Sequence, residues 1–128
     1  MKFALSLLSA LLILTGCATW EGLSPGAQAA LKGAAKVALS LAVTKLGESV
    51  HELRPYQDKL NGILNVTFSK ALPPEAIGSD LKRRVGLAVP VQHQAAVLAE
   101  FKRALAEAQP AAGPSQPADF NRRLAASL

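Results

Sequence analysis

The chain has 128 residues, 50% of them hydrophobic, and a formal net charge of +5. This length is enough for one small domain. Its single cysteine excludes an intramolecular disulfide and a four-cysteine metal site. The sequence contains no phosphate-binding glycine loop, no Gly-x-Ser-x-Gly motif, no nucleophile triad and no nucleic-acid-binding motif. We therefore expect neither catalysis nor binding to nucleic acid.

The N-terminus has the order of a secretory signal. Met1-Lys2 supplies a positive charge, and Phe3–Ile13 is an apolar run interrupted only by Ser6 and Ser9. The run is shorter than the roughly 20 residues that a bilayer-spanning helix needs. A cleaved or lipid-linked signal is therefore favoured over a permanent transmembrane helix.

Leu14-Thr15-Gly16-Cys17 follows this run and resembles the lipobox of bacterial lipoproteins. The resemblance covers residues 1–17 only. It implies cleavage between Gly16 and Cys17, with a thioether-linked diacylglycerol and an amide-linked acyl chain such as palmitate on Cys17. Two or more acyl chains give stable anchoring. Ala18, where an aspartate favours inner-membrane retention in enteric-type bacteria, implies the outer membrane, facing the periplasm. No other cofactor is expected.

Proline, glycine and charge divide the chain into segments. The predicted layout is a signal peptide at 1–16, a lipidated cysteine and tether at 17–24, a helical domain at 25–109, a Pro-rich linker at 110–117 and a short C-terminal helix at 118–128. Seven extended residues after the cysteine reach only about 25 Å, so the domain is expected close to the membrane. Trp20 in the tether either rests at the lipid interface or packs on the domain.

Ser24 and Pro25 predict the start of a first helix, as N-cap and first helical residue. It is expected to continue to about Leu53, because Arg54-Pro55 disfavours helical angles. The residues predicted to face inward are Leu31, Ala35, Leu39, Leu46, Val50 and Leu53. A strand at Val37–Val43 is the competing interpretation, which alanine content and length disfavour.

This first helix also carries a line of small residues at a spacing of four, which lets another helix approach closely. The line consists of Gly26, Ala30, Ala34, Ala38 and Ala42. Val37 and Leu41 fall away from the inward face, so the middle of the helix is apolar nearly all round. The helix is therefore expected to be either the central helix of the domain or a contact surface.

Three further segments show helical spacing. A helix from about Pro55 to Ala71 is favoured, although Asn61-Gly62 and the strand formers at Ile63–Phe68 leave a strand open. Pro73-Pro74 should end it, and residues 73–90 read as a connector with a short helix at Asp80–Gly86 capped by Ser79. The clearest helix runs from Val91 to about Gln109. Its buried face lists Gln94, Val97, Leu98, Phe101, Leu105 and Ala108.

The last segment follows the Pro-rich linker. Asp119 can cap a short helix, on which Phe120, Leu124 and Leu128 align at a spacing of four. A helix this short is marginal in isolation. It therefore needs the domain, the membrane or a partner to hold it.

Basic clusters are the better candidates for a binding site. They are Lys82, Arg83, Arg84, Arg122 and Arg123, which suit an anionic surface such as lipid headgroups, unless they form an ordinary solvated face. His51 beside Glu48 and Glu52 makes only an incomplete metal site, and no metal is expected. Gln94 on an apolar stripe indicates either an interhelical hydrogen bond or a polar partner.

Together these patterns predict an all-α fold, a small bundle of three to four helices tethered by lipid. The leading hypothesis is a non-catalytic, membrane-anchored envelope lipoprotein that serves as a structural or protein-interaction module. It would bind another envelope protein or itself, through the small-residue line or the terminal helix. The alternative is a binder of lipid or another amphipathic molecule in a groove between helices. The sequence leaves the partner and the oligomeric state open.

Overall fold

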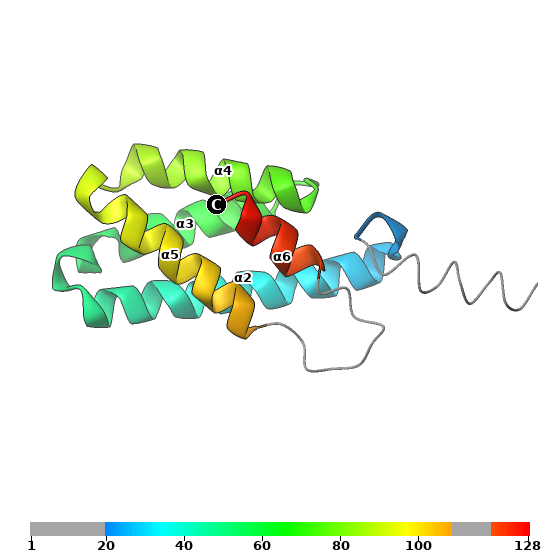
Figure 1. The fold of residues 1–128 in the computed structure, drawn as a ribbon, viewed down its shortest axis with the longest axis horizontal. Coiled ribbons are helices and arrows are strands. Elements are labelled where there is room, and N and C mark those ends of the chain that lie inside the picture. The colour runs from blue at the N-terminus through cyan, green and yellow to red at the C-terminus, as the bar shows by residue number, and fades with distance from the viewer. Residues whose placement is uncertain (1–19, 109–118) are drawn as a thin grey trace, which may run out of the picture.

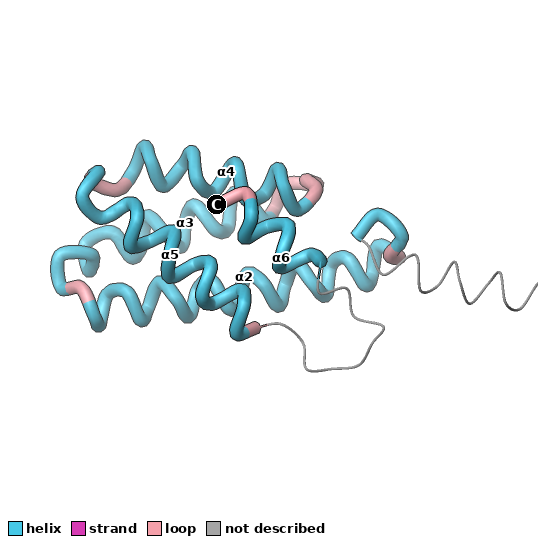
Figure 2. Tube along the Cα trace, in the orientation of Figure 1, coloured by secondary structure: helices cyan, strands magenta, loops and turns pink. Residues whose placement is uncertain are grey.

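The computed structural model describes residues 20–108 and 119–128, and this part of the chain is helical throughout, without a strand (Figures 1 and 2). The elements in order are η1 (Trp20–Gly22), α2 (Pro25–Ser49), η2 (His51–Tyr56), α3 (Gln57–Phe68), α4 (Pro74–Ala88), α5 (Val91–Glu107) and α6 (Asp119–Ala126), where η denotes a 3-10 helix. The all-α prediction is confirmed. The described part has five α-helices rather than three to four.

The start of α2 follows from its capping residues. Ser24 accepts a hydrogen bond from the Ala27 backbone N–H at 3.2 Å, and Pro25 is the first helical residue. The end of the helix differs from the prediction, because α2 stops at Ser49 and Val50 takes extended angles. The chain then turns through η2, which includes Pro55. The strand interpretation of residues 37–43 was wrong.

The proline pair before α4 begins a helix as well as separating two. The helical interpretation of the second segment is confirmed, with Asn61-Gly62 inside α3. Pro73 is the N-cap of α4 and Pro74 its first residue, a position where the missing N–H costs nothing. The predicted connector with a short helix at 80–86 was therefore wrong. Ser79 is an exposed residue inside a fifteen-residue helix and not its cap.

One hydrophobic core joins all five α-helices. α2 packs against α3 and α5, while α4 packs against α3, α5 and α6. In Figure 1, α5 crosses the bundle from the end of α4 toward α2, and α6 lies beside α4. The largest fully buried side chains include Leu39, Leu60, Leu81, Phe101 and Phe120, so every long helix contributes to the interior.

Residues on both sides of the predicted domain boundaries belong to this core. Trp20, which the sequence assigned to the tether, is only 6% exposed, and its ring stacks on Phe120 with centroids 4.5 Å apart. Of the two interpretations of Trp20, packing on the domain is the one found. Leu124 and Leu128 are also buried, so the domain itself covers the apolar side of α6. The predicted signal, lipidation and linker positions lie outside the described residues.

Candidate functional site

The predicted acylation site lies just ahead of the described chain. Cys17, and the cleavage position at Gly16, precede Trp20 by three and four residues. Three extended residues span about 10 Å. Because Trp20 is fixed near the first turns of α2, any lipid on Cys17 would be close to that end of the bundle.

The exposed residues on the outward side of α2 are uncharged over four turns, with the half-buried Lys36 at the edge of this side. Every exposed residue between positions 25 and 41 is apolar or glycine: Pro25, Gly26, Ala29, Ala30, Gly33, Ala34, Val37 and Leu41. We call this set the α2 outer face. Val37 is 60% and Leu41 66% exposed. A Cβ atom added at Gly26 or Gly33 would meet nothing within 4 Å, so this face is open.

The predicted small-residue line does not lie on one surface. Gly26, Ala30 and Ala34 are exposed, Ala38 is half-buried, and Ala42 is buried in the core. The last two border an open hollow of about 320 Å³ between α2 and α5. Only the first three residues of the line are therefore free for a partner helix, and Val37 and Leu41 extend that surface.

Two of the predicted basic residues bind an acid on their own helix. Arg83 and Arg84 donate to Asp80 at 2.6 and 2.8 Å, and the buried Thr67 hydroxyl donates to the same carboxylate at 2.8 Å. Burial alone would raise the pKa of Asp80, but the hydrogen bonds from Arg84, Thr67 and Arg83 hold it well below its usual range. This cluster links α3 to α4. Exposed Lys82 forms no ion pair with any described residue.

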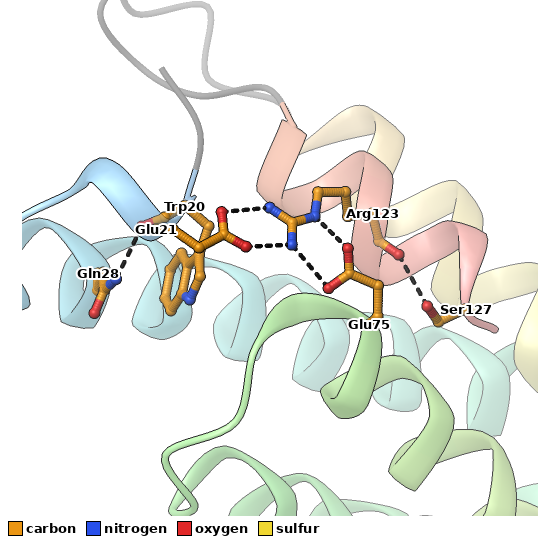
Figure 3. Close-up of polar contacts among 6 residues, drawn as sticks. All are labelled: Trp20, Glu21, Gln28, Glu75, Arg123 and Ser127. Carbon is orange, nitrogen blue, oxygen red and sulfur yellow. Dashed lines mark hydrogen bonds and ion pairs between the residues drawn. The ribbon is translucent and has the colours of Figure 1, made fainter. Parts of the chain in front are cut away.

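Arg123 connects three elements at the end of the bundle where Trp20 packs (Figure 3). Its guanidinium donates to both carboxylate oxygens of Glu21, at 2.6 and 2.9 Å, and to both oxygens of Glu75. The hydrogen bond from Arg123 lowers the pKa of Glu21 to about 2 and also lowers the pKa of Glu75. The residue thus ties η1 and α4 to α6, whereas its neighbour Arg122 is exposed.

The remaining polar candidates have internal explanations. Gln94 donates to the backbone oxygens of Gly86 and Val89 at 3.1 and 2.8 Å, which confirms the interhelical hydrogen bond. Arg103 pairs with Glu100 and Glu107 on its own helix. Within residues 20–108 and 119–128, no group of three His, Cys, Asp or Glu side chains is placed to hold a metal ion, and His51 is exposed.

The described helices include none with the length and apolar character needed to cross a membrane. Sequence reasoning missed the stack of Trp20 on Phe120 and the pairing of Glu21 with Arg123. Both join residues about a hundred positions apart, so no local pattern signals them. No protein-family model, curated protein or solved structure matches the chain.

Proposed function

We propose that this protein is a non-catalytic envelope lipoprotein, anchored by lipid on Cys17 in the outer membrane and facing the periplasm, that binds another protein through the α2 outer face. One observation carries the proposal. The same helix buries one apolar side in the core and leaves a second, mainly apolar side exposed, with Val37 and Leu41 at one end of it. Exposed contiguous apolar surface of this kind is typical of an interaction site.

The composition of the α2 outer face favours a helix as the partner surface. Glycine and alanine at Gly26, Ala30, Gly33 and Ala34 let two helix backbones approach closely. The larger Val37 and Leu41 supply apolar area at one end of the face. No exposed side chain between positions 25 and 41 is charged, so a docked partner has to accommodate only the half-buried Lys32 and Lys36 at the edge of the face.

A lipid or amphipathic small molecule is the weaker alternative. Such ligands usually occupy an enclosed, mostly apolar pocket. The hollow between α2 and α5 is open, and its lining consists of four alanines together with Leu41 and the charged Lys45, Arg103 and Glu107. A flat partner surface fits this geometry better than a buried acyl chain.

Site-specific photocrosslinking in the native envelope tests the interface. A photoreactive residue at Val37 or Leu41 should give a discrete crosslinked product that mass spectrometry identifies as a partner protein or a second copy. Val91 on α5 is the matched control, since it is 80% exposed and also apolar. Recovery of uncrosslinked monomer alone, or the same products from position 91, would contradict the proposal.

Fractionation of Cys17→Ala tests the anchor separately. In an enteric-type bacterial host, the variant should move from the membrane pellet to the soluble fraction, because the sulfur that takes the lipid is gone. Ala18→Asp serves as a control that keeps the lipid and should shift the protein to the inner membrane. If Cys17→Ala still pellets with outer membrane after a salt wash, the anchoring half of the proposal is wrong.

A further inference from the structure

The C-terminal helix depends on contacts outside itself. α6 has only eight residues, and a helix of this length is not stable alone in water. Phe120 and Leu124 are fully buried and Leu128 is 5% exposed. Tertiary contacts must therefore supply almost all of the stability of α6.

The segment that follows the predicted anchor makes two of these contacts. Trp20 stacks on Phe120, and Glu21 receives two hydrogen bonds from Arg123. The segment is itself held on α2, because the Gln28 side chain donates to the Trp20 carbonyl at 2.9 Å. Figure 3 shows the carboxylates of Glu21 and Glu75 on either side of the Arg123 guanidinium. Residues 20–21 and α6 thus stabilise each other.

The opposite side of α6 rests directly on α4 and α5. A Cβ atom added at Gly78 would lie 2.5 Å from the Leu124 carbonyl oxygen, so the two helix backbones are in close contact. Asn121, 7% exposed, donates to the Leu105 carbonyl at 3.1 Å. If α6 left, the surface of α4 around Gly78 and of α5 around Leu105 would be uncovered.

We propose that residues 20–23 and α6 form a clasp that opens as one unit, before the four longer helices unfold, and that opening uncovers α4 around Gly78 and α5 around Leu105. Two short segments form the clasp, and the carboxylates of Glu21 and Glu75 that bind Arg123 are half-exposed. Exposed ion pairs contribute little each, and local opening begins where stability is lowest. The coupling is independent of the lipid. It does not rest on the proposed anchor at Cys17, three residues before Trp20.

The fluorescence of Trp20 reports the state of the clasp, because it is the only tryptophan in the chain. In purified full-length protein, Arg123→Gln should shift Trp20 emission to the red and increase its quenching by acrylamide, with most of the helical circular dichroism retained. In urea, the wild-type emission change should precede the loss of circular dichroism at 222 nm. Coincident transitions, or unchanged emission in Arg123→Gln, would overturn the proposal.

Amide hydrogen exchange tests the reverse direction, since coupling between two sites is reciprocal. Glu21→Gln, a mild change at an exposed residue, should speed exchange in residues 120–128 by about two- to fivefold, since one exposed ion pair contributes little. Exchange in α3 should stay unchanged. Glu52→Gln, at another exposed acid, on η2, is the matched control and should alter neither region. If exchange in residues 120–128 stays at the wild-type rate in Glu21→Gln, the coupling is contradicted. Neither the fluorescence nor the hydrogen-exchange readout depends on lipidation. The clasp proposal can therefore fail while the fractionation result for Cys17→Ala stands.

Discussion

The two sides of α2 are equally apolar but differ in what they contact. Leu39 and Val43 on the inner side are fully buried, whereas Val37 and Leu41 on the outer side are 60% and 66% exposed. Leu39 and Leu41 are the same residue type two positions apart. Hydrophobicity alone therefore does not tell which side of this helix folds the domain. The inner side builds the core, and the outer side contributes little to it, which is the reason to assign the outer side to a partner.

Truncating the two leucines should give the largest contrast. Leu39→Ala leaves a cavity in the core and should lower the free energy of unfolding by about 2–5 kcal/mol. Leu41→Ala removes an exposed side chain and should change it by less than about 0.5 kcal/mol. Urea denaturation followed by circular dichroism measures both. Equal losses would mean that the outer face is part of the fold and not a free surface.

Local sequence signals were sufficient for most helices. Ser24 and Pro25 gave the start of α2, and helical spacing gave the buried sides of α5 and α6. The spacing also separated Val37 and Leu41 from the inward face. These features depend on residues within one or two turns, where capping and periodicity act directly.

The errors arose where two local signals competed or where the deciding contact was distant. Pro73-Pro74 predicts the end of a helix, but a proline is also favourable as the first residue of a helix, as Pro74 is in α4. The role of Trp20 depended on Phe120, and that of Arg123 on Glu21, at the far end of the chain. Such pairs appear only once the helices are arranged in space.

Replacing two neighbouring alanines of α2 by leucine tests the same difference between the inner and outer sides, with a smaller expected change in stability. Ala35 is 1% exposed and faces the core, while Ala34 is exposed on the outer face. Ala35→Leu overpacks the interior and should cost about 1–3 kcal/mol. Ala34→Leu should alter the free energy of unfolding by less than about 0.5 kcal/mol and instead weaken crosslinking from position 37. A destabilised Ala34→Leu together with a tolerated Ala35→Leu would reverse the assignment of the two sides.

Replacing a glycine on the α2 outer face should raise the stability of the fold instead of lowering it. A Cβ atom at Gly33 would meet nothing within 4 Å, and alanine is favoured over glycine in a helix interior by roughly 0.5–1 kcal/mol. Purified Gly33→Ala should therefore be more stable than the wild type in thermal denaturation. If a partner helix packs closely on Gly33, the same variant should give less crosslinked product in the envelope. A gain in stability with undiminished crosslinking would place the partner elsewhere.

The smallest effect on stability is expected from Glu21→Gln in the clasp, next to the first turns of α2. Glu21 pairs with Arg123, which also binds Glu75. Glu21 and Lys32 line one open hollow on the surface. The hydrogen bond from Arg123 lowers the pKa of Glu21 from 4.5 to about 2 in the folded protein. A lowered folded-state pKa stabilises the charged, folded form above pH 4.5, and this contribution disappears as the pH falls toward 2. The wild type should therefore keep Trp20 docked to higher urea than Glu21→Gln near neutral pH, and the difference should shrink between pH 4.5 and 2. A difference that stayed constant across this range would show that the Glu21 carboxylate does not hold the clasp closed.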